Sequence, residues 1–494
     1  MARAAYGAYA SMTSFLFATT ALAQTVPGSD ALDLGVLVLS ADNRLETPVD
    51  EATRSVTVIP QEEIERQGGV TNTVADVLAN TTPGFSQSTE GLTDFGQTLR
   101  GRTFLVLIDG VPQSTPLRDG RRSLNSIDSA SVERIEVVRG GNASFGFGAT
   151  GGTINIVTKR PEDGEARSFV SGGFKFSTTE PEDSASYEVQ LGTTGRTGNI
   201  DYLFDGTFLN TGANFDADGR RIPADTTGAQ GGIAEAESFS ILGKVGLNFD
   251  NDRQRIELSA LRYRFQQDPE FGGISFDGDP ANDIRTPAVE GNFNPVNPGT
   301  ENTNVNLTYT HEDIMGSSLT AQLYYTDLEI TYGTFPGFPQ TQILSEKLGG
   351  RLTVNTPLGG FLGTSDASLT WGIDALKDET RQIGTDNDEL FPGLGQPAPV
   401  LDQRAAAIFA QLELQVTDRF KVSTGLRHER IRIDVSDFIF VDAAAGTFTP
   451  TRGGRLSFNE TLANLTASYD VNDSLQIYGV FSQGFTVADI VRSL

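Results

Sequence analysis

Residues 238–249, Ser-Phe-Ser-Ile-Leu-Gly-Lys-Val-Gly-Leu-Asn-Phe, largely alternate between polar and apolar side chains. In an extended chain Phe239, Ile241 and Val245 share one face, and Lys244 and Asn248 share the other, because successive side chains of a strand point in opposite directions. One face of such a strand meets an apolar environment and the other meets a polar one. The stretch therefore predicts an amphipathic β-strand.

The same alternation recurs from about residue 166 onwards, for example at 304–309 and 406–415. Short connections such as 250–252 alternate along the chain with long ones such as 267–302. This rhythm is typical of a transmembrane β-barrel, which has short periplasmic turns and long external loops. We count about 13 strands, an odd number, whereas single-chain bacterial barrels normally have an even one. The count predicts a C-terminally truncated chain with a partial barrel over 165–494.

Residues 55–160 have a different pattern, which predicts a small α+β domain. Short helices are expected where apolar residues recur at helical spacing and Gly or Pro follows, and strands where β-branched residues run together. The predicted helices are 61–66 and 70–80, and the predicted strands include 103–108, 132–138 and 153–158.

The first residues have the form of an export signal. Arg3 supplies a positive charge, an apolar stretch follows, and Ala21-Leu22-Ala23 fits the small-x-small cleavage pattern before Gln24. Residues 1–23 are therefore predicted to be a cleaved signal peptide. Beyond residue 24 no run of 18 apolar residues occurs, so no transmembrane helix is expected.

Composition excludes several function classes. A formal net charge of −27 argues against nucleic acid as a partner, and the absence of cysteine excludes disulfides and thiol chemistry. The two histidines, His311 and His428, lie on separate predicted strands without a nucleophile or metal-ligand cluster. The acidic stretch at Asp277, Asp279 and Asp283 lacks the rest of a calcium loop. We therefore predict no enzyme activity, no cofactor and no metal site.

Three segments within 55–160 carry a resemblance to a known family. They are Leu-Arg-Gly at 99–101 with Leu-Val-Leu-Ile-Asp-Gly-Val-Pro at 105–112, Val-Glu-Arg-Ile-Glu-Val-Val-Arg-Gly at 132–140, and Gly-Gly-Thr-Ile-Asn-Ile-Val-Thr-Lys at 151–159. In this order and spacing they resemble the plug domain of TonB-dependent receptors. The resemblance implies an α+β plug domain followed by an antiparallel transmembrane β-barrel, which in this family has about 22 strands.

The resemblance also implies roles for particular plug residues. A set of enclosed charged residues is expected to lock the plug to the barrel, with Arg100 and Arg139 contacting carboxylates of the inner wall, although they could instead be solvated in a wet lumen. The set is Arg100, Glu133, Arg134, Glu136 and Arg139. Tight turns are expected at Gly101, Asp109, Gly110, Gly140, Gly151 and Gly152. The Gly-x-Gly-x-x-Gly at 146–151 precedes a strand, so we reject a dinucleotide site.

Residues 24–54 are expected to form an N-terminal extension with a TonB box near 33–40, where the family carries it. The segment is Asp33, Leu34, Gly35, Val36, Leu37, Val38 and Leu39. A TonB box acts by β-augmentation, in which an extended segment adds as a strand to the sheet of its partner. The alternative is an ordinary first strand of the plug.

Residues 481–490 are similar to the corresponding stretch of ferric-siderophore receptors. The resemblance therefore implies TonB-energised import of a ferric siderophore, with TonB, its inner-membrane energy complex and outer-membrane lipid as partners. Haem is less favoured, because the loops offer no histidine and Thr486-Val487-Ala488 stands where haem receptors usually carry Arg-Ala-Pro. Cobalamin, a glycan, a passive porin and a surface receptor remain alternatives. No ligand-contacting residue is assigned.

The Val36→Pro variant tests the predicted TonB box. Proline removes a backbone donor from a paired strand and clashes with its neighbours, and each lost bond is worth roughly 1 kcal/mol before register is disturbed. We expect ligand accumulation in energised cells to be abolished and surface binding at low temperature to be nearly unchanged. Val36→Ala keeps the donor and should be far milder. Normal accumulation by the proline variant would place the box elsewhere.

Overall fold

The structure is a computed structural model. It describes residues 38–39, 44, 47–48, 54–68, 73–88, 91–94, 96–117, 122–141, 144–224, 232–273, 287–292, 294–333, 340–385, 398–442, 447–472, 475–487 and 490.

A single antiparallel sheet of 13 strands forms the larger part of the molecule, and it agrees with the number expected from the alternation. Each strand pairs with the next long strand in the chain. The strands are β8 (Arg167–Lys175), β9 (Ser186–Thr197), β10 (Ile200–Thr211), β13 (Ala236–Phe249), β14 (Gln254–Gln267), β17 (Gly299–Ile314), β18 (Ser317–Thr331), β19 (Thr341–Pro357), β20 (Asp366–Gly384), β21 (Leu401–Thr417), β22 (Phe420–Val435), β25 (Gly454–Asn472) and β26 (Leu475–Ser482). We call this sheet the wall.

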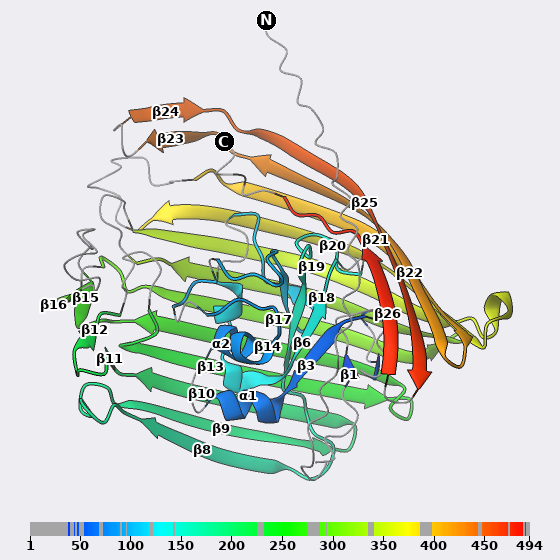
Figure 1. Ribbon diagram of the computed structural model, residues 1–494, viewed down its shortest axis with the longest axis horizontal. Coiled ribbons are helices and arrows are strands. Elements are labelled where there is room, and N and C mark those ends of the chain that lie inside the picture. Colours follow the sequence, from blue (N-terminus) through cyan, green and yellow to red (C-terminus); the bar gives the residue numbers. More distant parts are fainter. Residues whose placement is uncertain are drawn as a thin grey trace, which may run out of the picture.

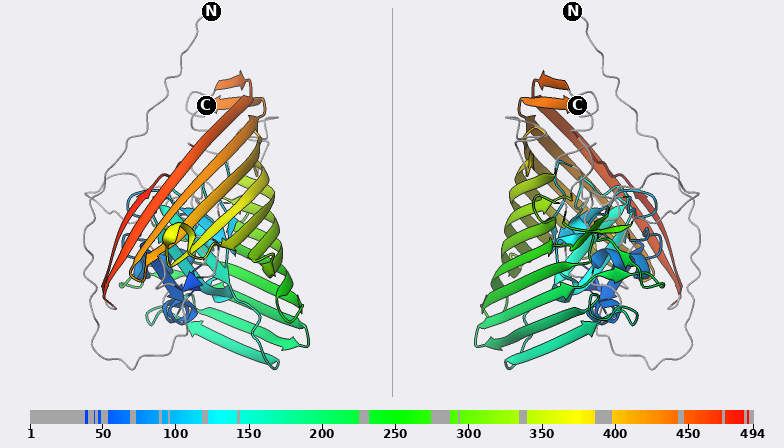
Figure 2. Two further views of the ribbon diagram at one scale, coloured as in Figure 1. Left: turned by 90° about the vertical axis from the view of Figure 1, so that its right-hand side faces the viewer. Right: turned by 90° about the vertical axis from the view of Figure 1, so that its left-hand side faces the viewer.

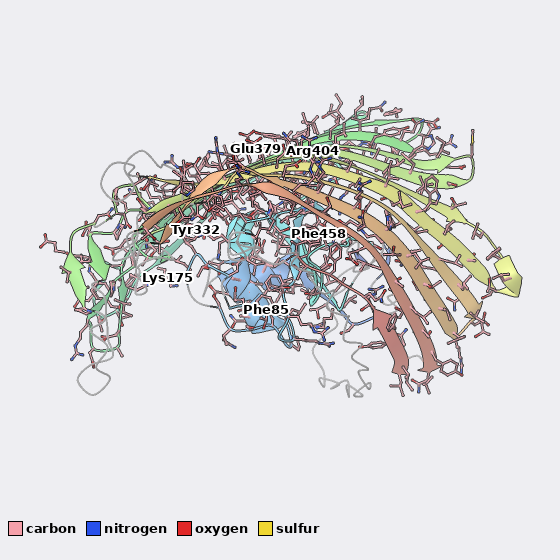
Figure 3. All side chains as sticks on the ribbon, turned by 90° about the horizontal axis from the view of Figure 1, so that it is seen from above. Phe85, Lys175, Tyr332, Glu379, Arg404 and Phe458 are labelled. Carbon is pink, nitrogen blue, oxygen red and sulfur yellow. The ribbon has the colours of Figure 1, made fainter. Side chains whose placement is uncertain are left out.

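The wall is curved, and the N-terminal α+β domain lies against its concave face (Figures 1 and 3). Viewed from above, Glu379 and Arg404 project from the convex face, whereas Phe85 lies in the enclosed domain (Figure 3). Among the described residues β8 and β26 pair on one side only, so they form the two edges of the wall.

The two faces of the wall differ in polarity. On β14 the convex face carries Ile256, Leu258 and Ala260, and the alternate residues, such as Ser259, face the enclosed domain. Leu258 is 51% exposed and Ile408 is 60% exposed to the surroundings. A contiguous apolar outer belt of this kind is unfavourable in water and suits a lipid bilayer.

The long connections and the short turns lie at opposite ends of the wall. Three long connections carry small hairpins at one end, and the short turns lie at the other (Figures 1 and 2). The hairpins are β11 (Asn214–Phe215) with β12 (Arg221–Ile222), β15 (Phe271–Gly273) with β16 (Ala288–Glu290), and β23 (Phe438–Asp442) with β24 (Thr447–Thr451). The 3-10 turn η4 (Phe361–Gly363) lies in the connection between β19 and β20.

The enclosed domain, which we call the plug, contains a five-stranded mixed sheet in the order β3-β6-β7-β4-β5. Its elements are β3 (Val56–Pro60), α1 (Gln61–Gly68), α2 (Val74–Thr81), β4 (Leu105–Ile108), β5 (Val111–Pro112), η2 (Ser123–Asn125), η3 (Ser129–Ser131), β6 (Val132–Arg139) and β7 (Gly152–Thr158). Strands β4 and β7 are parallel, and the other pairs are antiparallel. No helix in the described part of the chain has the length and hydropathy to span a membrane.

The plug has an apolar core of its own, in which α2 packs on the central strands. Val77, Leu78, Ile135 and Ile154 are completely buried in it. The wall extends this core with leucines of β10, β13 and β14, namely Leu203, Leu242 and Leu261.

The helices and strands predicted for the plug lie close to the observed ones, but some of their boundaries differ. The second helix, expected from residue 70, begins at Val74 because Thr73 caps it: the Thr73 side chain accepts a hydrogen bond from the backbone N–H of Asp76. The strand expected over 103–108 begins at Leu105.

Replacing Leu258 by Arg tests the lipid-facing role of the convex face. An arginine near the bilayer midplane costs about 2–4 kcal/mol in a transmembrane barrel. We expect the variant to give much less folded, heat-modifiable receptor in the outer membrane, whereas Leu258→Phe should assemble normally. Equal assembly of both variants would show that this face does not meet lipid.

Candidate functional site

The plug meets the wall at the turn Asp109–Gly110, which joins β4 to β5. The Asp109 carboxylate accepts hydrogen bonds from the Thr158 backbone N–H at 2.9 Å and hydroxyl at 2.6 Å, and it lies 3.4 Å from the Lys244 ammonium of β13. Gln322 of β18 donates to the Asp109 carbonyl at 3.2 Å, and Arg351 of β19 donates to the Gly110 carbonyl. Three wall strands therefore hold one plug turn through polar contacts.

A second contact is centred on Asp374 of β20. The Arg44 guanidinium, from the segment that precedes the plug, binds both Asp374 oxygens at 2.6 and 2.7 Å. Arg427 of β22 binds the same carboxylate at 2.7 Å, and Arg351 Nε lies 3.9 Å from it. Arg427 also pairs with Glu429 at 2.9 Å. One carboxylate of the wall thus collects three arginines, of which one comes from the N-terminal segment.

Aromatic rings enclose this ionic contact. The Arg44 guanidinium carbon lies 4.4 Å from the ring centroid of Phe409 on β21 and 5.0 Å from that of Phe145 in the plug. Burial is the main cause that lowers the pKa of Arg44 to about 10; Asp374 opposes it, and the neighbouring Arg351 and Arg427 act in the same direction as burial.

Gly146 allows the plug to approach this cluster. A Cβ atom there would lie 2.1 Å from a Glu429 carboxylate oxygen and 2.3 Å from Arg427 Nε, and the residue has a φ of +73°. The glycine-rich stretch 146–151 therefore serves close packing of plug on wall, in keeping with the rejected dinucleotide interpretation.

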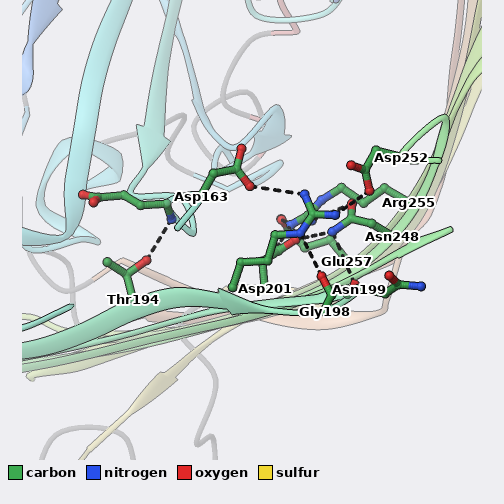
Figure 4. Close-up of polar contacts among 11 residues, drawn as sticks. Asp163, Thr194, Gly198, Asn199, Asp201, Asn248, Asp252, Arg255 and Glu257 are labelled. Carbon is green, nitrogen blue, oxygen red and sulfur yellow. Dashed lines mark hydrogen bonds and ion pairs between the residues drawn. The ribbon is translucent and has the colours of Figure 1, made fainter. Parts of the chain in front are cut away.

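A polar cavity of about 720 Å³ lies between the plug and strands β9 to β19. Its lining includes Arg44, Asp109, Arg351 and, towards the short turns, the ionic cluster of Figure 4. In that cluster Arg255 pairs with Asp201 at 2.8 Å, and Arg196 joins the turn residue Asp252 at 2.5 Å to Asp163 at 3.3 Å. Because Asp163 follows the last plug strand, this cluster anchors the connection between plug and wall.

The predicted lock residues form contacts within the plug. Arg134 pairs with Glu133 and with Glu136 at 2.9 Å on the same strand. Arg139 donates to the hydroxyls of Ser55 and Thr57 and to the Pro83 carbonyl. Arg100 is exposed and its backbone N–H donates to the Gly84 carbonyl. A locking role for this set stays a prediction, and the ion pairs to wall carboxylates that we describe are made by Arg44 and Lys159, with Lys159 3.0 Å from Asp205.

The predicted turns have the backbone expected of turns. Asp109 and the glycines at 101, 110 and 140 have φ between +46° and +90°. Gly151 and Gly152 lie where β7 begins, and a Cβ at Gly151 would be 2.6 Å from the Thr103 carbonyl oxygen. His311 and His428 are far apart, on β17 and β22, and the described residues contain no metal-binding group of three or more His, Asp or Glu.

Several predicted residues lie outside the described part of the chain. They are the signal peptide, residues 33–37 of the expected TonB box, and Asp277, Asp279 and Asp283. The last two box residues form β1 (Val38–Leu39), which pairs antiparallel with β2 (Thr47–Pro48).

The stretch with the siderophore-receptor resemblance packs back on the plug. The backbone N–H of Gly148 donates to the Phe485 carbonyl at 3.0 Å, and the rings of Phe147 and Phe485 lie 5.7 Å apart. Phe485, which follows β26, therefore contacts the glycine-rich plug segment 146–151. The same segment lies against Arg427 and Glu429 of the Asp374 cluster.

Sequence reasoning missed the residues that join the plug to the wall: Arg44, Lys244, Gln322, Arg351, Asp374 and Arg427. The sequence indicates only that the five wall residues are polar and occupy lumen-facing positions of strands with alternating side chains. Nothing local distinguishes them from the other lumen-facing polar residues.

Asp128 lies at a third contact, beside β9 and β10. Its side chain accepts a hydrogen bond from the Ala130 N–H at 2.9 Å, and Gln190 of β9 donates to the Ala130 carbonyl. Burial is the main cause that raises the pKa of Asp128 to about 7; the carboxylates of Glu188 and Asp205 act in the same direction, and the Ala130 hydrogen bond and Lys159 oppose them.

This arrangement defines the class of protein. A wall that is apolar outside and polar inside, with an α+β domain held on its concave face, is that of a plugged outer-membrane β-barrel. A family model described as "TonB-dependent Receptor Plug Domain" matches residues 48–153, and one described as "TonB dependent receptor-like, beta-barrel" matches residues 238–492, more than half of the chain. The chain belongs to the TonB-dependent receptor family.

Two curated relatives are named as receptors for rhizobactin and for ferric aerobactin. The chain is 29% identical over 506 residues to a rhizobactin receptor of Rhizobium meliloti, covering 96% of this chain and 66% of that protein. It is 29% identical over 489 residues to a ferric aerobactin receptor of Klebsiella pneumoniae, covering 92% and 64%. The chain thus spans about two thirds of the length of these relatives.

The fold is also shared with solved structures. The closed form of the ferric-catecholate import receptor Fiu of E. coli K12 superposes with a TM-score of 0.68 at 16% identity, covering 90% of this chain and 68% of that one. Identity this low supports the fold alone.

The pH dependence of plug stability tests the Asp128 environment. Because its pKa is higher in the folded than in the unfolded state, its stabilising contribution is complete below about pH 4 and is lost as the pH rises through about 7. The loss should approach about 1 kcal/mol per pH unit in this window. We expect Asp128→Asn to reduce the difference between melting temperatures at pH 5 and pH 8, measured by circular dichroism. An unchanged difference would contradict the assignment.

Proposed function

We propose that the protein is an outer-membrane receptor that imports a ferric siderophore with energy supplied through TonB. The plug closes the concave side of the wall and is held there by hydrogen bonds and ion pairs, so a bulky ligand cannot diffuse past it. Import then requires work on the plug, and no bond in the ligand needs to be made or broken. The names of the rhizobactin and ferric aerobactin receptors support the ligand class.

The observation that carries this proposal is the buried Arg44–Asp374 contact. Arg44 lies close in sequence to the predicted TonB box at 33–39, and its guanidinium reaches a carboxylate 330 residues further along the chain. A pull on the N-terminal segment by TonB would act directly on a contact between plug and wall. A passive porin has no use for such a connection.

Growth under iron starvation tests the proposed ligand and energy source together. A strain that lacks the gene should lose growth on ferric aerobactin or ferric rhizobactin as sole iron source, and the intact gene should restore it. Restoration should disappear in a strain without TonB, because the plug closes the passive route. The control is ferrous iron, which should support all strains equally.

Growth that is restored by haem and by no ferric chelate would contradict the siderophore assignment. Restoration without TonB would instead favour a passive porin. These outcomes separate the ligand from the energy source.

A further inference from the structure

Two cavities lie one above the other along strand β19. A small upper cavity of about 40 Å³ is lined by Lys347, and the lower cavity of about 720 Å³ is lined by Thr353. Phe145 of the plug and Arg351 of the wall line both cavities. Residues 347, 351 and 353 follow one another towards the short-turn end of the lumen-facing side of β19, so the cavities are stacked along the direction of transport.

The Arg44–Asp374 ion pair lies at the boundary between the cavities. Asp374 lines the upper cavity, whereas Arg44 lines the lower one. Arg44 also contacts the rings of Phe145, which lines both cavities, and of Phe409. We call Phe145, Arg351 and this ion pair the partition.

The cavity sizes show where passage is blocked. A volume of about 720 Å³ is within the ~300–1,000 Å³ that small-molecule sites occupy. The upper cavity, at about 40 Å³, lies far below that range. The lower cavity therefore has room for a ligand as it stands, whereas a ligand that comes along β19 from the long-loop end can enter it only if the partition moves.

The charges of the partition favour release of Arg44 in particular. With Arg44 in place, three arginines (44, 351 and 427) face two carboxylates (374 and 429). After Arg44 leaves, two arginines remain with two carboxylates. Asp374 keeps its 2.7 Å contact to Arg427, so no buried charge is left uncompensated. The wall thus tolerates the loss of this side chain better than that of Arg427.

We propose that the two cavities are parts of one passage along β19 and that the partition is its gate, opened when Arg44 is withdrawn from Asp374. Phe145 then loses its cation-π contact with Arg44, keeps the longer one with Arg351 at 5.7 Å, and can turn aside while the apolar core of the plug stays folded. This inference rests on the proposed import function and adds to it the route of the ligand and the residues that close it.

Cysteine accessibility tests the route, because the chain contains no cysteine of its own. Thr308 of β17 lines the lower cavity, below the partition. Thr308→Cys should be protected from a maleimide-coupled dye added outside intact cells, if the dye is too large for porins but similar in size to a ferric siderophore. With Phe145→Ala added, we expect labelling to rise several-fold without ligand or energy.

Thr466→Cys is the matched control, because Thr466 is a buried threonine of the wall on β25 that lines neither cavity. It should stay protected in the Phe145→Ala background. Equal labelling of both positions would show that the whole plug has been displaced, which would overturn the gate.

Arg44→Gln is a second gate variant, for use if Phe145→Ala assembles poorly. It should expose Thr308→Cys while leaving Thr466→Cys protected. Protection of Thr308→Cys in every assembled gate variant would overturn the proposal. Because this labelling needs no ligand, it tests the gate separately from the proposed import function. A receptor that labels as expected but imports no ferric siderophore would contradict the proposed function and not the gate.

Discussion

Every backbone N–H and C=O group in hydrocarbon must be paired within the protein, and the rest of this structure depends on that constraint. Between its edge strands β8 and β26, the wall meets it by pairing each strand in register with both neighbours, as β13 and β14 do from Ala236–Gln267 to Phe249–Gln254. Once the strands are paired, alternate side chains point to lipid and to the lumen. The part of the outer face that meets lipid must then be apolar, so polar contacts with the plug lie on the inner face.

A polar inner face decides how the plug is held. The plug keeps an apolar core of its own, which the wall extends through three leucines of β10, β13 and β14. Two smaller apolar clusters also join plug and wall, at Leu92 and at Leu117. Between these clusters the plug is held by hydrogen bonds and ion pairs around Asp109, Asp128 and Asp374. Because polar contacts exchange more readily for water than apolar ones, the polar part of the interface is where we expect the plug to move first.

Much of the fold could be predicted from local pattern. Period-two alternation located the wall strands and their number, and capping and turn residues located the plug helices and the Asp109–Gly110 turn. The predictions were less accurate at boundaries such as the start of α2, which was expected at residue 70 and begins at Val74, directly after the Thr73 cap. The charged plug residues were expected to lock the plug to the barrel, and the structure shows Arg134 paired with Glu133 and Glu136 of its own strand.

The sequence by itself determined the class of architecture, because strand periodicity, loop rhythm and the plug motifs are local properties that can be recognised without knowing the fold. Only the tertiary structure decided which lumen-facing residues join the plug to the wall. Arg44 and Asp374 are separated by 330 residues, and no local signal sets them apart from the other polar residues on their segments. Their contact exists because the curvature of the wall brings β20 opposite the N-terminal segment. A long-range ion pair of this kind depends on the position of every strand between its partners.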